Sequence, residues 1–129
     1  MNNSIIDLLI RIKNGYLAKN ENVVSPHSTF KEAVVKKLEA LGYIKSHTIT
    51  KDGVKKQIQM VLVYDEGVPA FTDLKIFSKP GRRWYVTKKD MKQVLGGLGY
   101  GVVSTPKGLL TSMEAKQQQI GGELLFEIW

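Results

Sequence analysis

The sequence lacks cysteine and holds only two histidines, which narrows the chemistry open to it. Without cysteine, neither a disulfide nor a thiolate metal site can form. His27 and His47 lie in different predicted elements, and neither has an acidic or serine partner at a spacing typical of catalysis. No pair of carboxylates has a spacing that suggests acid–base work. We therefore predict no catalytic residue, no metal site, no cofactor and no enzymatic activity.

Long apolar runs are missing as well. The longest falls far short of the roughly 18 residues that a membrane-spanning helix needs. The N-terminus has no basic segment ahead of its apolar residues, and Asp7, Arg11 and Lys13 interrupt them, which is unlike a secretory signal peptide. These absences favour a cytoplasmic protein without a membrane partner. The 129 residues, 43% of them hydrophobic, suffice for one compact unit or two small subdomains that share a core.

Negative charge is scarce between residues 75 and 116. The whole chain has 19 Lys and Arg against 12 Asp and Glu, a net charge of +7. Residues 75–116 alone hold nine basic and two acidic residues, an excess equal to that of the whole chain. A basic region of this density indicates a polyanionic partner such as nucleic acid. A solvated lysine-rich surface is the plainer alternative, and charge alone does not decide between them.

The apolar pattern predicts an α/β (α+β) fold in two small subdomains. The first part is predicted to hold a helix over residues 4–17, a strand at 23–24, a second helix from about 29 to 41 and a hairpin of strands 43–50 and 55–64. The acidic segment 65–69 contains Gly and Pro and marks a boundary. We therefore divide the chain into a helix-strand-helix-hairpin subdomain, 1–66, and a subdomain of mainly antiparallel sheet with a short helix, 67–129.

A polar loop is predicted where an apolar strand ends at Pro106, which has no amide hydrogen for the sheet. This loop presents Ser104, Thr105, Lys107 and Gly108. Hydroxyls donate and accept hydrogen bonds, so they suit base edges and ribose 2′-hydroxyls, and glycine lets backbone come close to a ligand. The alternative is a simple strand-ending turn whose hydroxyls satisfy local backbone. The residue types alone leave both interpretations open.

A short helix and a closing strand are predicted after this loop. Thr111 or Ser112 can cap the helix, and Gly121 and Gly122 are predicted to end it. Residues 124–129 then return as a strand. The polar loop would thus be held between two strands and a helix.

A second basic turn precedes this region. Pro80-Gly81 is a turn signal, and Arg82 and Arg83 follow it directly. Two adjacent arginines on a turn have few internal partners, which favours pairing with phosphates. The next two residues, Trp84 and Tyr85, could stack on a base. The alternative, which we expect for one or both rings, is packing in the core.

Several of these motifs occur in an order that is typical of one family. The pattern Ser-Thr-x-Lys-Gly-x-x-Thr begins at Ser104, and Glu-Ala, then Gly-Gly-Glu at 121–123, then a closing Trp129 follow it. This ordered set resembles the eighth protein of the bacterial small ribosomal subunit, the S-eight family. Further segments resemble the family's opening helix, second helix with its exit, and central turn: 7–14, 26–32, 41–44 and 78–83.

The resemblance implies an RNA-binding protein with no small-molecule substrate. It implies binding to the central domain of small-subunit ribosomal RNA early in subunit assembly, with neighbouring small-subunit ribosomal proteins as further partners. In some bacteria the family also represses its own operon by binding a similar structure in messenger RNA, a partner that the sequence leaves open. The RNA contacts implied here are Ser104, Thr105, Lys107, Gly108, Gly121, Gly122, Glu123, Arg82, Arg83 and Lys31.

One departure affects the polar loop directly. Pro106 stands where the family usually has a third hydroxyl, so any hydrogen bond of that side chain is lost here. Two other functions stay open: an enzyme acting on a phosphorylated ligand held by glycines 97–101 and nearby lysines, and a basic module that binds protein. Such an enzyme would need a nucleophile, base or metal arrangement, and none is visible. Saturable binding to one RNA without turnover would separate the three.

Overall fold

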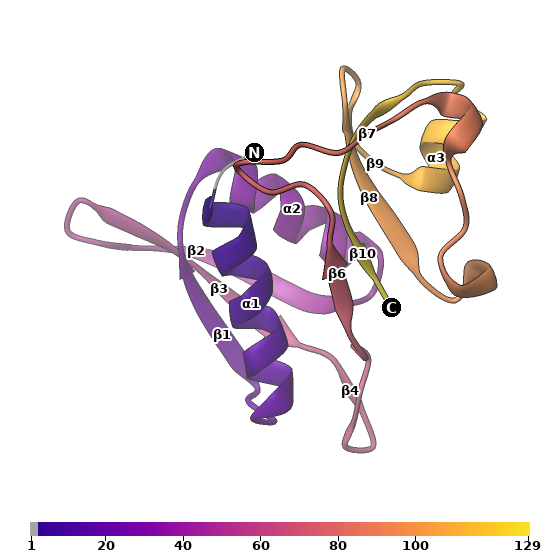
Figure 1. Cartoon of the computed structure of the whole chain (residues 1–129). Helices are drawn as coiled ribbons and strands as arrows, with labels where there is room; N and C mark the ends of the chain where they lie inside the picture. The colour runs from indigo at the N-terminus through magenta and orange to yellow at the C-terminus, as the bar shows by residue number, and fades with distance from the viewer. Residues whose placement is uncertain (1–2) are drawn as a thin grey trace. The chain divides into compact units, whose positions relative to one another are not determined.

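A computed structural model describes residues 3–129, which form two compact units (Figure 1). The N-terminal unit comprises Ser4–Phe71, and Thr72–Trp129 belong to the C-terminal unit. Both contain helix and antiparallel sheet, which confirms the predicted α+β class. None of the helices within 3–129 is long and apolar enough to cross a bilayer.

The N-terminal unit holds two helices and a three-stranded antiparallel sheet in the order β1-β3-β2. Its elements are α1 (Asn3–Leu17), β1 (Asn22–Pro26), α2 (Thr29–Ala40), β2 (Ile44–Asp52), β3 (Lys55–Leu62), β4 (Tyr64–Asp65) and β5 (Val68–Pro69). Ser28 caps α2 by accepting a hydrogen bond from the Lys31 amide. Most of the apolar stripe predicted for each helix is buried: Ile5, Leu8, Leu9, Ile12, Val34 and Leu38. Leu17, at the end of the first stripe, is 71% exposed instead.

The segment after β3 belongs with the N-terminal unit. Strands β4 and β5 pair with each other, and the Phe71 ring stacks on Tyr16 with centroids 5.2 Å apart. These contacts place the division between the two units after Phe71, slightly beyond the boundary predicted after Glu66. The subdomains 1–66 and 67–129 stay a prediction.

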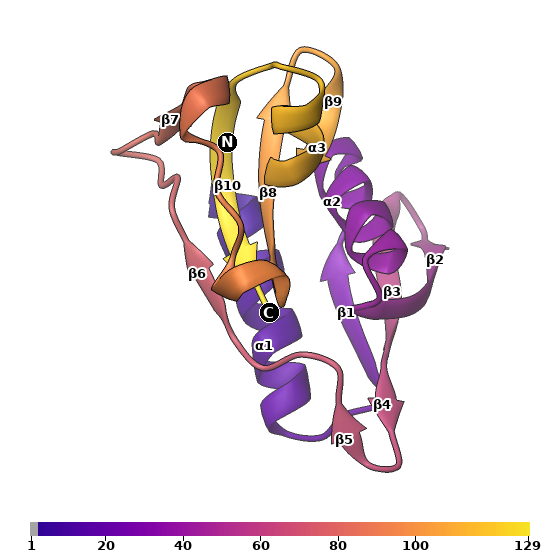
Figure 2. The same ribbon diagram turned by 90° about the vertical axis from the view of Figure 1, so that its right-hand side faces the viewer.

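The C-terminal unit is an antiparallel sheet in the order β6-β10-β8-β9, with β7 pairing on β10 (Figure 2). Its elements are β6 (Leu74–Ile76), β7 (Tyr85–Val86), the 3₁₀ turns η1 (Lys88–Asp90) and η2 (Leu95–Gly97), β8 (Tyr100–Thr105), β9 (Gly108–Thr111), α3 (Ser112–Gln117) and β10 (Gly122–Ile128). A buried cluster of Met91, Val103, Ala115 and Leu124 holds α3 against this sheet. Because β10 pairs with β6 and β7 as well as with β8, it has neighbouring strands on both sides.

The short helix α3 begins as predicted and ends differently. Thr111 caps it with a full capping box, because its hydroxyl accepts from the Glu114 amide while the Glu114 carboxylate accepts from the Thr111 amide. The predicted stop at Gly121 and Gly122 is wrong. The helix ends at Gln117, Gln119 adopts the left-handed φ of +56° that glycine often takes, and Gly122 already starts β10.

Candidate nucleic-acid interface

The polar loop of the sequence is a tight turn that joins β8 to β9. Thr105 pairs with Gly108 across the turn, so Pro106 and Lys107 occupy its two central positions. Proline suits the second position of such a turn because its φ is fixed, and Gly108 at the fourth takes a φ of +103°. Pro106 thus ends β8, as predicted.

The Thr105 hydroxyl serves this turn. It donates to the Gly108 carbonyl at 2.8 Å and accepts from the Lys107 amide at 3.1 Å. Both bonds are local, so the strand-ending alternative describes Thr105 well. One acceptor lone pair of this hydroxyl stays open.

Ser104 differs from its neighbour. Its backbone is fixed from two sides, because it pairs with Glu123 of β10 and with Leu109 of β9. Its side chain is half-buried, and nothing within the described chain hydrogen-bonds to its hydroxyl. A hydroxyl that is held in place and free to donate and accept is suited to reading an external polar group.

Gly121 and Gly122 are required by the protein's own packing. A Cβ on Gly122 would collide with the Ser104 carbonyl oxygen, and one on Gly121 would lie 2.8 Å from the Val86 carbonyl oxygen. The two glycines therefore let β10 approach β8 and β7 closely. This closeness is what brings the Ser104 strand and the Tyr85 strand to the same site.

Five of the predicted residues line one open groove across β7, β10 and β8. The groove has a volume of about 530 Å³. The five predicted residues along it are Ser104, Thr105, Gly121, Gly122 and Glu123. Sequence reasoning did not assign its other lining residues to this site: Tyr85, Val86, Thr87 and Pro106. We call this feature the β7–β8 groove. Lys107 and Gly108 lie at the adjoining turn and do not line it.

Each of the two arginines of the second turn has a side-chain partner within the chain that the sequence did not reveal. The Arg83 guanidinium lies 3.4 Å from a Glu123 carboxylate oxygen, and the Glu123 side chain is only 14% exposed. Arg82 lies over the Trp84 ring, 5.5 Å from its centroid. Arg83 therefore orients Glu123 at the groove, and both arginines keep further donors for phosphates.

The two aromatic residues after the arginines are more exposed than predicted. Tyr85 is 72% exposed and Trp84 is 39% exposed. Trp84 has an internal partner, since it meets Phe77 edge to face at 5.5 Å. Tyr85 pairs through its backbone with Glu123, which places its ring at the groove. Packing of the Tyr85 ring in the core is therefore wrong. The only sign of its exposure in the sequence was the alternation of side chains along the short strand β7.

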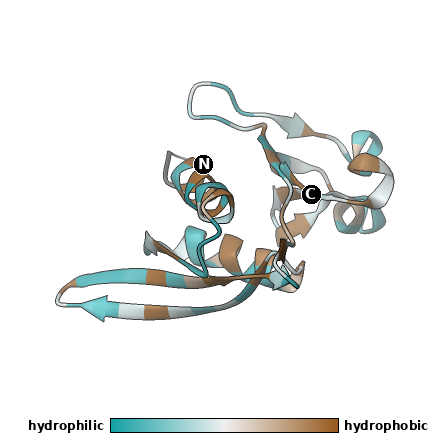
Figure 3. Ribbon diagram, turned by 90° about the horizontal axis from the view of Figure 1, so that it is seen from below, coloured by the Kyte–Doolittle hydropathy of each residue, from teal (hydrophilic) through white to brown (hydrophobic). Residues whose placement is uncertain are grey.

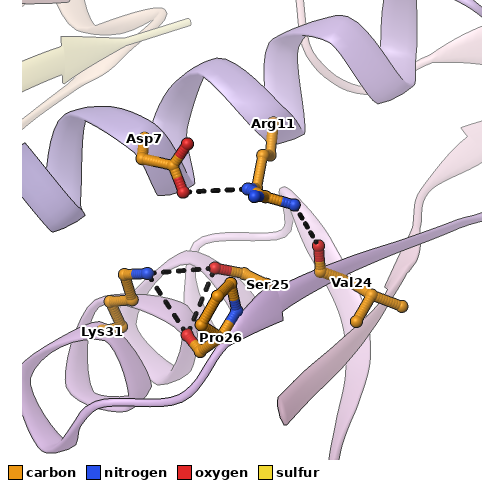
Figure 4. Close-up of polar contacts among 6 residues, drawn as sticks. All are labelled: Asp7, Arg11, Val24, Ser25, Pro26 and Lys31. Atoms are coloured by element: carbon orange, nitrogen blue, oxygen red, sulfur yellow. Dashed lines mark hydrogen bonds and ion pairs between the residues drawn. The ribbon is translucent and has the colours of Figure 1, made fainter.

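Lys31 belongs to the N-terminal unit, whereas the residues of the groove belong to the C-terminal unit. It is 4% exposed, and its ammonium donates to Ser25 Oγ at 3.3 Å and to the Pro26 carbonyl at 3.2 Å (Figure 4). Arg11 of α1 contacts the same strand, because its guanidinium donates to the Val24 carbonyl of β1. These contacts give Lys31 a structural role in joining α2 to β1, and they correct its use as a phosphate contact.

Both histidines have acidic partners that sequence spacing did not reveal. His27 Nε2 lies 2.7 Å from Glu32, and His47 Nδ1 lies 2.9 Å from Glu39. The hydrogen bond with His27, followed by that with Lys36, lowers the pKa of Glu32 below its ordinary 4.5. Within residues 3–129, no three side chains of the metal-binding types come together. The two His–Glu contacts each join residues of the N-terminal unit.

Comparison with known proteins agrees with the order of motifs along the chain. The family model described as Ribosomal protein S8 matches residues 3–129. The small ribosomal subunit protein uS8 of Dictyoglomus turgidum is 41% identical over 125 residues, which cover 97% of this chain and 95% of the relative. The protein of the same name from Zymomonas mobilis is 44% identical over 123 residues, covering 95% and 94%.

A third relative extends the match to the whole chain. The small ribosomal subunit protein uS8 of Novosphingobium aromaticivorans is 40% identical over 129 residues, 100% of this chain and 98% of the relative. The family is one of structural ribosomal proteins and not of enzymes. The chain belongs to the ribosomal protein S8 family of the small ribosomal subunit.

Proposed function

We propose that the chain binds the central domain of small-subunit ribosomal RNA through the β7–β8 groove and helps to assemble the subunit. The observation that carries this proposal is the free Ser104 hydroxyl, fixed between two strands and facing the same groove as the exposed Tyr85 ring. Family membership supports the ribosomal setting. The location that follows is the ribosome, beside other small-subunit proteins.

The groove suits an irregular RNA feature and not a regular duplex. A-form RNA has a major groove too narrow for side chains, so specific readers take bases that are unpaired or splayed out. Tyr85 offers a ring on which such a base can stack, and stacking accepts any base. Ser104 then offers its hydroxyl to base edges and 2′-hydroxyls, whereas the Thr87 hydroxyl, which donates to Asp90 at 3.0 Å, can offer only an acceptor. Shape and polar contacts together give one feature an advantage over others.

Glu123 has a defined part in this arrangement. A carboxylate repels phosphate, but it accepts hydrogen bonds from a base amino group. The 3.4 Å contact with Arg83 holds this side chain in one orientation at the groove. We propose that Glu123 accepts from an amino group of the bound base while Arg83 offsets its charge. Discrimination between bases would then depend on the pair.

General affinity has a different source. Lys88, Lys89 and Lys107 are exposed on the turns beside the groove. Each phosphate contact that a lysine makes releases counterions, which makes affinity dependent on salt but not on sequence. We assign these lysines, together with the remaining donors of Arg82 and Arg83, to the phosphate backbone. A similar structure in the chain's own messenger RNA would compete for the same groove.

The test compares Ser104→Ala with Ser46→Ala, a matched control on β2 in the other unit whose hydroxyl is exposed and makes no hydrogen bond in the described chain. Both variants are titrated at fixed salt against the central-domain RNA and an unrelated duplex of equal length. Ser104→Ala should lose about 1–3 kcal/mol on the central-domain RNA alone, the range for one discriminating contact. Equal loss on both RNAs, or no loss, would contradict the proposal.

A further inference from the structure

The β2–β3 hairpin of the N-terminal unit is rich in charged residues. It is distant in sequence from the residues of the β7–β8 groove. Strand β1 pairs with β3 only as far as Gln57, and the His27 amide donates to the Lys56 carbonyl at 3.0 Å. From Lys55 to the tip, the two strands pair only with each other within the described chain. Residues 48–57 are all exposed, and Val54 at the tip is 95% exposed. Figure 1 shows this hairpin extending from the sheet of its unit, and Figure 3 shows its outer part in mainly hydrophilic colours.

Two lysines face each other on this extension. Lys51 lies directly opposite Lys56 in the ladder, and opposite residues have Cβ atoms roughly 5 Å apart on the same face. The next pair inward on that face is Ile49 and Ile58, and Ile58 is fully buried. The face of the hairpin that packs on the core at Ile58 therefore presents, nearer the tip, the ammonium groups of Lys51 and Lys56.

No acid among residues 3–129 forms an ion pair with either lysine. Asp52 is the only carboxylate near the tip in sequence, and it lies opposite Lys55, on the other face of the ladder. Neither Lys51 nor Lys56 makes an ion pair or hydrogen bond through its side chain within residues 3–129. Like charges placed directly opposite destabilise a hairpin, and a two-stranded hairpin without a covered face is marginal already.

We infer that Lys51 and Lys56 form a phosphate clamp, a second contact with RNA that is independent of the β7–β8 groove. A phosphate between the two ammonium groups would turn their repulsion into two attractive contacts. This inference rests on the proposed function, since it takes the ribosomal RNA as the source of that phosphate. The clamp supplies affinity and not sequence recognition, because phosphate contacts carry no base information.

A charge-matched pair of variants tests the clamp. Lys51→Gln with Lys56→Gln removes two charges at the clamp, and Lys19→Gln with Lys45→Gln removes two exposed charges elsewhere in the same unit. Each full-length protein is titrated against a small-subunit ribosomal RNA transcript at several salt concentrations. The clamp variant should bind about tenfold more weakly and lose about one unit of salt slope per phosphate. The control should lose less than twofold.

A label at the tip supplies a second measurement. The chain has no cysteine, so Val54→Cys gives a single site for a tethered iron chelate that cleaves nearby RNA. Cleavage at a discrete set of nucleotides is expected, and it should weaken when the two clamp substitutions are added. Absence of cleavage, or cleavage that the clamp variant leaves unchanged, would overturn the inference, as would a clamp variant that binds like the control.

The outcomes separate this inference from the proposed function. If Ser104→Ala weakens binding and the clamp variant does not, the groove stands and the clamp fails. If the unmodified protein binds no ribosomal RNA, both fail. Melting curves check the fold, and the clamp variant should melt at the same or a higher temperature because a like-charge pair has been removed. A lower melting temperature together with unchanged RNA affinity would assign the lysines to structure and overturn the clamp.

Discussion

The β8–β9 turn and the β2–β3 turn are both tight hairpin turns with lysine, but their surroundings differ. The first is braced, because β8 also pairs with β10, α3 packs on the sheet, and Thr105 hydrogen-bonds across the turn. In the second, every residue from 48 to 57 is exposed, and β1 pairs with β3 only as far as Gln57. Specific recognition needs groups held in fixed positions, whereas phosphate contact does not. We therefore propose that Ser104 beside the braced turn discriminates between RNA features, whereas the lysines of both turns supply general affinity.

The largest effect should come from removing the close approach that braces the groove. Gly122→Ala would place a Cβ against the Ser104 carbonyl, with Thr105 and Val103 side-chain carbons at 3.0 Å. We expect a loss of about 1–3 kcal/mol in the free energy of unfolding, with weaker RNA binding. Thermal or urea unfolding measures it. Gly81→Ala is the control, because its Cβ meets nothing within 4 Å, and equal effects would contradict this account.

Tyr85→Ala should rank second and act on binding alone. The ring is mostly exposed, so its removal should leave the melting temperature nearly unchanged. Loss of one stacked base should weaken binding to the central-domain RNA by about 1–3 kcal/mol. Leu98→Ala, also highly exposed and in the same unit, serves as the control in the same titration. Unchanged affinity in Tyr85→Ala would remove the ring from the proposed site.

Thr105→Ala should act mainly on stability, in contrast to Ser104→Ala. It removes the donor to the Gly108 carbonyl and the acceptor for the Lys107 amide. We expect a loss of about 1 kcal/mol in the free energy of unfolding, the usual net worth of such hydrogen bonds. Thr105→Ser should restore most of it. If Thr105→Ala melts like the parent but binds the central-domain RNA more weakly, the hydroxyl serves RNA and not the turn.

The smallest effect concerns acid stability of the N-terminal unit. His27 and Lys36 lower the pKa of Glu32, so the folded state favours the ionised carboxylate. Its contribution is present above pH 4.5 and is lost as pH falls through the lowered folded value. Glu32→Gln should therefore flatten the fall in melting temperature below pH 4.5. Glu66→Gln, an exposed acid without a side-chain partner in the described chain, should leave that fall unchanged, and identical profiles for both variants would contradict the assignment.

Local signals in the sequence were sufficient for most elements of the fold. The helix spacing of α1 and α2, the capping residues of α3 and the stop at Pro106 all depend on neighbours in sequence, and the structure confirms them. The end of α3 was missed because Gln119 adopts a left-handed φ that sequence rules assign to glycine. Gly121 and Gly122 were misread because their role is close contact with strands that are distant in sequence.

The candidate site was predictable only where its residues are adjacent in sequence. The Ser104–Gly108 motif was found, but its division into a structural Thr105 and a free Ser104 depends on hydrogen bonds across the turn. Tyr85 joins the groove through strand pairing with Glu123, a neighbour almost forty residues away. Lys31 was predicted at RNA from resemblance alone, whereas its burial arises from tertiary contacts with Ser25 and Pro26.

The central claim is that the β7–β8 groove binds one feature of the central-domain RNA through Ser104. A hydroxyl-radical footprint on full-length small-subunit ribosomal RNA tests it most directly, with the unmodified chain, Ser104→Ala and Ser46→Ala at one protein concentration. We predict a discrete protected site in the central domain that Ser46→Ala keeps and Ser104→Ala loses or weakens. Protection outside the central domain, or equal protection by all three proteins, would contradict the claim.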